Sequence, residues 1–398
     1  MNILMLHNRY LVPGGEDQST AAEANLLQQQ GCSVELLQED NRRVEQLGKA
    51  RTAIRTIWSS ESFHRIYDKL RTGKFDVLHV QNFFPLWSPS VYYAAAKCNV
   101  PVVQTLRNYR LMCVNAVFYR DSHVCEDCLG KRFAWPGILH ACYRDSRAGS
   151  AVVAGMSGIH HLAGTWRTKI HVYVALTEFA RNKYIAGGLP AEKILVKPNF
   201  VYPSPQPGHG QGGYALFVGR LSPEKGIATL LKAWQAAAHS LPLKIVGDGP
   251  SSDAVEAAAR QNHAIEYLGR RSPDEVAHLM GRAEILVFPT ECYEGMPRTV
   301  IESFAVGTPV LASNLGATAS MVVPGETGFH FTPGSVADLR ERVEWCSQNF
   351  DQLRAMRPNA RRAFENSYTG AANARTLLAI YEKARDAARR GPDQNRSR

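Results

Sequence analysis

Short apolar runs alternate with amphipathic stretches along the whole chain. Runs rich in Val, Ile and Leu are typical of buried strands, and the longer stretches between them have the spacing of crossover helices. This alternation predicts parallel sheets flanked by helices. Strands are predicted in the first half near residues 2–7, 33–37, 76–80, 100–105 and 171–176. In the second half they are predicted near residues 215–218, 243–246, 265–268, 285–288 and 310–312.

Each half therefore has the pattern of a doubly wound α/β unit. The chain has 398 residues, more than one hydrophobic core usually serves, so two domains are expected. Residues 202–213 are dense in proline and glycine and almost lack apolar side chains, which favours a linker. The predicted order is a first domain at 1–201, the linker, a second domain at 214–369, a helix at 370–390 able to pack on either domain, notably back on the first, and a basic tail at 391–398.

A helix start near the end of the second half carries the most informative chemistry. The strand at 285–288 is followed by Glu294 and then by Pro297, which fits the first helical position because its missing N–H costs nothing there. Such a start offers unpaired backbone N–H groups and the positive end of the helix dipole, which suits a diphosphate. Glu302 lies roughly 7 to 8 Å further along the helix, a depth that suits a sugar or ribose hydroxyl. Ordinary helix capping by acidic residues is the alternative.

Glycine-rich turns follow several strands of the same half. The first holds Gly219 together with Arg220 and Lys225, a planar fork and a point charge that can neutralise a diphosphate. The next two turns hold Gly247, Asp248, Gly249 and Gly269. All are predicted to lie on one edge of the sheet, where ligands of such sheets bind. The alternative for each turn alone is tight connection geometry.

Composition and charge narrow the class of protein. With 45% hydrophobic and 21% charged residues the chain has the composition of a soluble globular protein. Its net charge of +10 indicates an anionic partner: a nucleotide, a nucleic acid or an acidic membrane surface. No secretory signal is visible, so a cytoplasmic location is expected, with the inner face of the membrane as a variant. The uncharged stretch 148–166 contains two histidines and four glycines, which favours a packed helix or a membrane-surface patch over a membrane-spanning helix.

Four of the eight cysteines gather in one segment, residues 113–142. Cys125 and Cys128 have the spacing of a zinc knuckle, with Cys113 and Cys142 on either side. The interpretations are a structural zinc site, buried free thiols, or a redox pair; His123 and His140 are substitute ligands. A closed thiolate site leaves no open coordination position, so zinc would order this insertion rather than perform chemistry.

The G-R-x4-K pattern at 219–225 and the E-x7-E pattern at 294–302 resemble family 4 of the retaining glycosyltransferases, in the glycosyl transferases group 1. The resemblance covers nearly the whole chain. It implies the GT-B fold, two facing Rossmann-like domains with a cleft between them. It also implies that Arg220 and Lys225 bind the donor diphosphate and that Glu302 holds the ribose. The donor sugar would contact Glu294 and the backbone of Gly295, Met296 and Pro297. The turns at 247–249 and 269 would shape the base and ribose pocket.

Two features of the first domain are judged against the same resemblance. Gly14 and Gly15, in a P-G-G loop after the first strand, are implied to reach the donor phosphates; a plain strand-to-helix turn is the alternative. Many members carry a histidine in a T-x-H-[DN] pattern after the fourth strand, where this chain has Arg107. An arginine stays charged and cannot act as a base, but it can bind a phosphate or a sugar hydroxyl. A structural role is its alternative.

The expected function is transfer of a sugar from a UDP-sugar to a glycan or glycolipid acceptor, with retention of configuration. The sequence has no Asp-x-Asp motif for a metal, so Arg220, Lys225 and the helix starts are expected to stabilise the leaving diphosphate, and no cofactor is expected for the chemistry. Glu294 and Arg107 complete the expected catalytic set. Peripheral membrane association is a further expectation.

Three other classes are weighed against this one. A nucleotide-sugar epimerase or phosphorylase of the same fold is disfavoured by the E-x7-E pattern. A nucleic-acid-binding protein is disfavoured because no stripe of basic and stacking aromatic residues is evident. An NAD dehydrogenase is disfavoured because no G-x-G-x-x-G follows the first strand.

Overall fold

The computed structural model describes residues 1–11, 14–236 and 241–390. The chain divides into two compact units. The first contains residues 1–118, 126–198 and the chain from Asn373 onward, and the second contains residues 119–125 and 199–372. The division after residue 198 comes just before the predicted linker. The predicted tail at 391–398 and residues 12–13 of the P-G-G loop lie outside the described residues.

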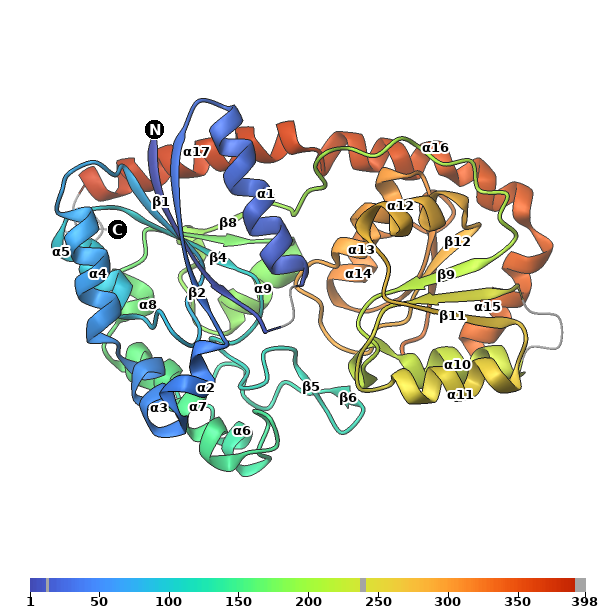
Figure 1. The fold of residues 1–398 in the computed structure, drawn as a ribbon, viewed down its shortest axis with the longest axis horizontal. Helices are drawn as coiled ribbons and strands as arrows, with labels where there is room; N and C mark the ends of the chain where they lie inside the picture. Colours follow the sequence, from blue (N-terminus) through green and yellow to red (C-terminus); the bar gives the residue numbers. More distant parts are fainter. Residues whose placement is uncertain (12–13, 237–240, 391–398) are drawn as a thin grey trace. The chain divides into compact units, whose positions relative to one another are not determined.

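The first unit is built on a six-stranded parallel sheet with the order β2-β1-β3-β4-β7-β8 (Figure 1). Its strands are β1 (Asn2–Arg9), β2 (Ser33–Asp40), β3 (Val77–Asn82), β4 (Val102–Leu106), β7 (Val172–Ala175) and β8 (Ile194–Val196). Its helices are α1 (Gly15–Gln29), α2 (Arg43–Leu47), α3 (Lys49–Ile57), α4 (Ser60–Leu70), α5 (Ser90–Lys97), α6 (Trp135–Leu139), α7 (Arg147–Leu162), α8 (Thr165–Thr168), α9 (Glu178–Ala186), the 3-10 turn η1 (Ala191–Lys193) and α17 (Gly370–Arg389).

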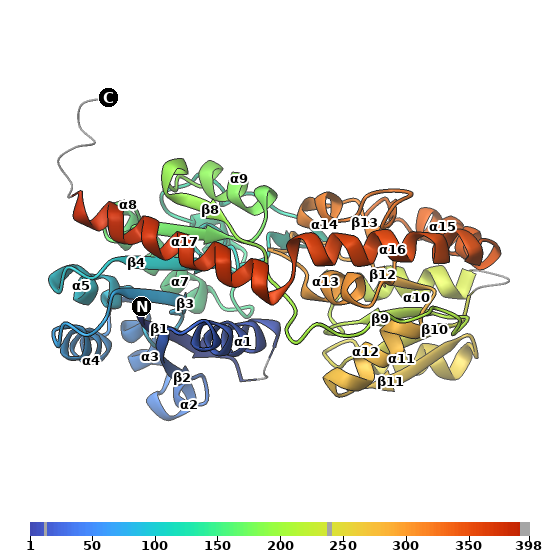
Figure 2. The ribbon, with the colours of Figure 1, turned by 90° about the horizontal axis from the view of Figure 1, so that it is seen from above.

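The C-terminal helix α17 completes the core of this unit, although it follows the second unit in sequence. Leu377, Ile380 and Tyr381 are buried in one hydrophobic cluster with Ile3 and Met5 of β1. Figure 2 shows α17 running along the strands of the first unit. The helix therefore packs where β1, β3, β4 and β7 present apolar side chains.

The second unit has its own six-stranded parallel sheet, in the order β11-β10-β9-β12-β13-β14. Its strands are β9 (Ala215–Val218), β10 (Leu243–Val246), β11 (Ile265–Gly269), β12 (Ile285–Phe288), β13 (Val310–Ser313) and β14 (Gly328–Phe331), with the hairpin β5 (Tyr119–Arg120) and β6 (His123–Val124) as a separate pair. Its helices are η2 (Pro223–Lys225), α10 (Ile227–Ala236), α11 (Ser252–Gln261), α12 (Pro273–Arg282), α13 (Arg298–Ala305), α14 (Gly316–Met321), α15 (Val336–Gln348) and α16 (Phe350–Ser367).

All ten predicted strands are present, and 215–218, 243–246 and 285–288 have the predicted bounds. The strands that the sequence did not predict are β8 and β14, one of the two edge strands of each sheet, and the hairpin β5–β6. β8 has only three residues, and β14 begins with a glycine and has two half-buried residues at its centre. The three apolar residues of β8 are too short a run to mark a strand, and the glycine and histidine of β14 interrupt its apolar pattern.

The uncharged stretch 148–166 forms α7 and the start of α8, as a packed helix. Val153, Ala154 and Met156 are buried on one side of α7. Within the described ranges, none of the helices combines the length and the apolar character needed to cross a membrane.

Candidate functional site

The strand order reverses between β9 and β12 in the second unit, so the connections after these neighbouring strands leave toward opposite faces of the sheet. Ligands of doubly wound sheets bind at such a point, outside the carboxyl ends of the strands. The loop after β9 holds Gly219, Arg220 and Lys225, and the loop after β12 holds Glu294 and Gly295. The topology therefore brings the two sequence motifs to one place.

Lys225 and Glu294 form an ion pair, although they are 69 positions apart. Thr290 also donates a hydrogen bond to Glu294 Oε1, at 3.1 Å. Burial alone would lower the pKa of Lys225, but the Glu294 carboxylate raises it to about 12. The Lys225 side chain keeps 24% of its surface exposed. The site thus holds a permanently charged ammonium that remains in reach of a ligand.

Gly226 explains how the two loops approach one another. Its φ of +71° is left-handed, and a Cβ atom here would lie 1.9 Å from the carbonyl oxygen of Pro289. Only glycine permits this contact between η2 and the end of β12. The backbone after Lys225 is therefore held directly against the loop that carries Glu294.

Two of the predicted donor glycines have a structural reason of their own. A Cβ atom on Gly247 would lie 1.8 Å from the Gly219 carbonyl oxygen, and one on Gly249 would lie 2.4 Å from that of Leu221. These glycines let the turn after β10 pack on the turn after β9. By contrast, a Cβ atom on Gly219 would make only an ordinary side-chain contact, at 3.5 Å. A Cβ atom on Gly269 would meet no atom within 4 Å, although the φ of +63° at this residue favours glycine. Tight connection geometry thus accounts for Gly247 and Gly249 without a ligand.

The helix start differs from the prediction by one residue. Pro297 is the N-cap, with an extended ψ of 112°, and α13 begins at Arg298. Arg298 Nε donates a hydrogen bond to Glu302 Oε1, at 2.7 Å, across one helical turn. Met296 is buried and its sulfur accepts a hydrogen bond from the Asn199 N–H, at 3.1 Å. Glu302 is therefore paired in this structure, and a ribose hydroxyl would have to share it with Arg298.

The remaining charged residues at this edge are exposed. Arg220 pairs with no carboxylate among the described residues, so its guanidinium is available to an anion. Asp248 lies 3.9 Å from Arg270, and both side chains are more than half exposed. Such a pair contributes little to stability.

Sequence reasoning missed four residues that order the site. Thr229 donates to Glu291 Oε1, at 2.6 Å, and the Glu291 N–H donates to the Glu224 carbonyl oxygen, at 2.9 Å. Burial, with a contribution from Glu294, raises the pKa of Cys292 to about 12 and keeps the thiol neutral. The signal that could have identified these residues is their position in the sequence, close to Lys225 or to Glu294.

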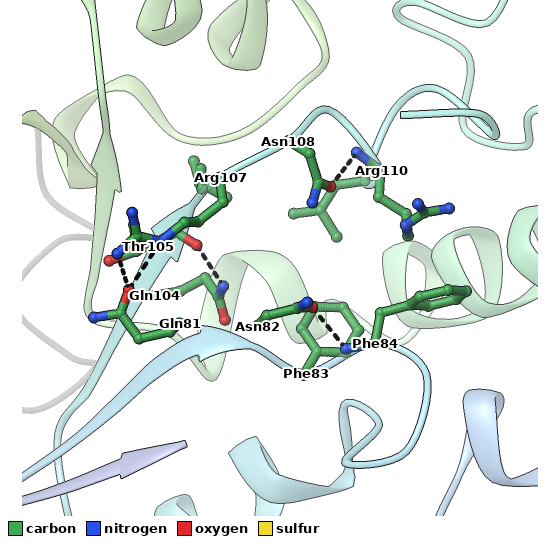
Figure 3. Close-up of a pocket in the computed structure, with 11 residues that line it drawn as sticks. Gln81, Asn82, Phe83, Phe84, Gln104, Thr105, Arg107, Asn108 and Arg110 are labelled. Atoms are coloured by element: carbon green, nitrogen blue, oxygen red, sulfur yellow. Dashed lines mark hydrogen bonds between the residues drawn. The ribbon is translucent and has the colours of Figure 1, made fainter. Parts of the chain in front are cut away.

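A pocket lies in the first unit at the carboxyl ends of β3 and β4, between Gln81 and Leu111 (Figure 3). Arg107 lines it but is nearly buried, and its Nε and Nη2 atoms donate to Gln81 Oε1 at 3.1 and 2.6 Å. The Arg110 guanidinium lies 4.3 Å from the centre of the Phe84 ring. No carboxylate is among the residues that line this pocket.

Behind this pocket, Gln81 leads to a buried ionic cluster that the sequence did not predict. Gln81 Nε2 donates to Glu23, whose other carboxylate oxygen accepts from Lys197 Nζ at 2.7 Å. His79 Nδ1 is 2.7 Å from the Tyr381 hydroxyl. Although burial by itself raises the pKa of Glu23, Lys197 lowers it to about 2. The cluster thus joins α1, β3, β8 and α17 beneath Arg107.

His79 is expected to make the first unit sensitive to acid. Burial lowers its pKa from 6.5 to about 4, so between these values the unfolded chain binds a proton that the folded chain does not. The contribution of His79 to the free energy of unfolding is therefore highest above pH 6.5 and falls by about 3 kcal/mol as the pH approaches 4. Burial also lowers the pKa of His171 to about 4, so His171 adds to the fall in the same range. Urea denaturation from neutral pH to about pH 4 measures this fall. A His79→Gln variant should show a shallower dependence, and equal slopes for both proteins would contradict the assignment.

The glycine loop of the first unit is described from Gly14 onward. Gly14 is the N-cap of α1, and its N–H donates to Asp17 Oδ2, at 2.9 Å. The other oxygen of Asp17 accepts from His7 Nε2, at 2.8 Å. With Glu16 and Asp17 in its first turn, this helix start already carries negative charge, which works against a diphosphate there. The donor contact of Gly14 and Gly15 stays a prediction.

The four clustered cysteines are not gathered in this structure. None of them is in a disulfide, and within the described residues no three His, Cys, Asp or Glu side chains are arranged to hold a metal ion. Cys128 and Cys142 contribute to an apolar cluster with Val114 and Val153. Burial raises the pKa of the Cys113 thiol, which donates to Asn115 Oδ1, at 2.9 Å. Cys113 and Cys128 are buried, whereas Cys125 and Cys142 are half-buried. The zinc site stays a prediction, and we derive no chemistry from it.

The fold and this edge define a class: two doubly wound α/β domains of the GT-B type, with paired basic and acidic loops at the reversal point of the second sheet. Residues 205–363 match the family model of the glycosyl transferases group 1. The expected resemblance to the glycosyl transferases group 1 is therefore confirmed for these residues. The narrower assignment to family 4 of the retaining enzymes stays a prediction.

Known proteins resemble the chain in part or in fold. It is 28% identical over 179 residues to the uncharacterized glycosyltransferase MJ1178 of Methanocaldococcus jannaschii, covering 44% of this chain and 50% of that protein. It is 29% identical over 136 residues to a lipopolysaccharide 1,2-N-acetylglucosaminetransferase of Salmonella typhimurium, which covers 31% of this chain and 36% of that protein. These matches span half or less of the relatives' lengths. The crystal structure of Anabaena HepE with UDP-glucose covers 96% of this chain and 99% of its own, with a TM-score of 0.67 at 15% identity. The GT-B fold is thereby confirmed.

Proposed function

We propose that this chain is a glycosyltransferase that moves a sugar from a nucleoside diphosphate sugar, a UDP-sugar in the first instance, to an acceptor. The observation that carries the proposal is the Lys225–Glu294 pair at the reversal point of the second sheet, inside the region that matches the glycosyl transferases group 1. HepE, which shares the fold, binds UDP-glucose. We further propose an acceptor in polysaccharide or glycolipid assembly, since one relative acts on lipopolysaccharide.

In this proposal the diphosphate sits against Lys225 and Arg220, with the start of α13 beside it. The ammonium and guanidinium are held in place before the reaction, so they stabilise the charge that develops on the leaving diphosphate without reorganisation. Glu294 orients Lys225 and accepts from a hydroxyl of the donor sugar. Glu302 accepts from the ribose in competition with Arg298.

The reaction is proposed to retain the anomeric configuration. The acceptor oxygen forms its bond to the anomeric carbon on the face from which the diphosphate oxygen departs. The acceptor's proton passes to that departing oxygen, which carries the electron pair of the broken bond. No side chain then has to serve as the general base, and this suits a site whose nearest thiol, Cys292, stays neutral.

A thermal-shift screen across UDP, GDP, ADP and their sugars tests the donor site. A ligand that binds only the folded state raises the unfolding temperature by mass action. We expect UDP and one UDP-sugar to raise it and the other nucleotides to do so less. Transfer to an acceptor glycan with that donor, followed by NMR of the product's anomeric proton, then tests retention. A chain that none of these nucleotides stabilises would not be a transferase of this type, and an inverted product would refute the retaining step alone.

A further inference from the structure

An unusual number of large apolar side chains is exposed on one part of the first unit. In the described part of the chain ten large hydrophobic residues are exposed, and seven of them come from α3, from α6 with the loop before it, and from α7. Helix α7 contacts both α3 and α6 (Figure 1). The seven residues are Ile54, Trp58, Phe133, Trp135, Leu139, Ile159 and Leu162, and we name them the α3–α7 surface. Ile54 and Leu162 are 70% and 77% exposed.

Helix α7 supplies the centre of this surface. Its solvent side repeats every three or four residues and, after Arg147 at the first position of the helix, carries no charge. The residues on this side are Ala148, Ala151, Val152, Gly155, Ile159 and Leu162. The opposite side is buried in the unit, through Val153 and Met156. A helix that is packed on one side and apolar on the other normally has a second partner.

The other two helices border this stripe on either side. A Cβ atom at Gly158 would lie 2.8 Å from the ring of Phe133, so the loop before α6 lies directly against α7. His160 Nε2 is 2.9 Å from the Ile57 carbonyl oxygen, so the end of α3 lies against the other side of α7. The exposed residues therefore lie on elements that pack side by side, with α7 in the middle.

Basic residues outnumber acidic ones in the segments that carry this surface. Lys49 and Arg51 lie on α3, and the segment 131–169 adds six basic residues to a single acidic one, Asp145. These six are Lys131, Arg132, Arg144, Arg147, Arg167 and Lys169. A large part of the net charge of +10 thus borders this one surface.

Exposed apolar side chains together with basic residues favour a lipid bilayer as the binding partner of this surface. Trp, Phe and Leu side chains beside Lys and Arg are typical of helices that lie in the interface of a bilayer, where the apolar groups enter the headgroup region and the cations meet anionic lipids. We propose that the α3–α7 surface docks the chain on a bilayer that contains anionic lipids. This binding site is separate from the proposed donor site, because none of its residues lies in the second unit.

Co-sedimentation with lipid vesicles tests the proposal. The whole protein is mixed with phosphatidylcholine vesicles or with vesicles made of equal parts phosphatidylcholine and phosphatidylglycerol. We expect binding to the mixed vesicles, weaker binding to phosphatidylcholine alone, and a decrease with added salt because salt screens the lipid charge. The variant Ile159→Ser/Leu162→Ser should lower the affinity for mixed vesicles roughly tenfold or more, since two apolar groups no longer leave water. Arg147→Gln/Arg167→Gln should reduce the difference between the two kinds of vesicle.

Matched controls lie in the second unit. Val323 is 44% exposed and Arg260 is 71% exposed, so Val323→Ser and Arg260→Gln alter an exposed apolar group and an exposed cation elsewhere and should bind vesicles like the wild type. All of these positions are on the surface, and a thermal melt verifies that each variant is folded. If the wild type fails to sediment with mixed vesicles, or self-associates through Ile159 and Leu162 instead, the surface is not a membrane-docking site. Equal binding by the Ile159→Ser/Leu162→Ser variant would overturn it as well.

Discussion

Lys225→Ala is expected to weaken the binding of UDP more than tenfold, or about 1.4 kcal/mol, and to lower the rate of sugar transfer about 10²- to 10³-fold. The variant loses the cation opposite the diphosphate and removes the ammonium that faces the Glu294 carboxylate, which is 15% exposed. The remaining negative charge would then repel the ligand. Calorimetric titration with UDP measures the affinity, and saturating donor separates this effect from the effect on the rate.

The double variant Lys225→Ala/Glu294→Gln distinguishes the two causes of this loss. If repulsion by the Glu294 carboxylate contributes, removing its charge should restore part of the affinity for UDP but not the rate. Lys244→Ala is the matched control, because Lys244 lies on β10 of the same sheet and pairs with Glu266 at 3.0 Å. It should bind UDP like the wild type. Unchanged affinity in Lys225→Ala would refute the diphosphate role of this residue.

The sequence could predict the candidate site of the second unit because each of its two motifs is a short stretch of consecutive residues. G-R-x4-K and E-x7-E each follow a buried strand, and the doubly wound order places the ends of β9 and β12 side by side. What the patterns could not tell is which glycines serve a ligand. Gly247 and Gly249 are required by the carbonyl oxygens of Gly219 and Leu221, and a contact of this kind depends on the packing of two turns. The sequence does not record it.

The first unit was less predictable for a different reason. Arg107 was recognised only as a departure from a family pattern, and its partner Gln81 lies within β3, where polar residues carry no periodic signal. Glu23 and Lys197 are 174 positions apart. A buried ion pair of this kind arises from tertiary structure alone, so neither residue could be distinguished from a surface charge by composition or spacing.

Lys197→Met is expected to lower the free energy of unfolding by about 3 to 5 kcal/mol. Lys197 and Glu23 are 1% exposed, so removing the ammonium leaves a carboxylate buried with Gln81 as its remaining donor in the cluster. Its pKa would then rise, because burial is no longer opposed by Lys197. Urea denaturation at neutral pH measures the loss.

The double variant Lys197→Met/Glu23→Gln should recover most of that stability, because no charge is then left unpaired in the interior. Arg260→Met is the control: Arg260 forms an exposed pair with Glu256, at 3.7 Å, and its removal should change the free energy of unfolding by about 0.5 kcal/mol or less. A loss for Lys197→Met as small as that of the control would mean that water reaches the pair. The double variant also shows what the cluster does for Arg107. In this variant an amide replaces the Glu23 carboxylate on α1 and can still bond to Gln81. If hydrogen bonding determines the orientation of Gln81, this side chain stays between Arg107 and position 23; if the charge of the ion pair determines it, Gln81 moves.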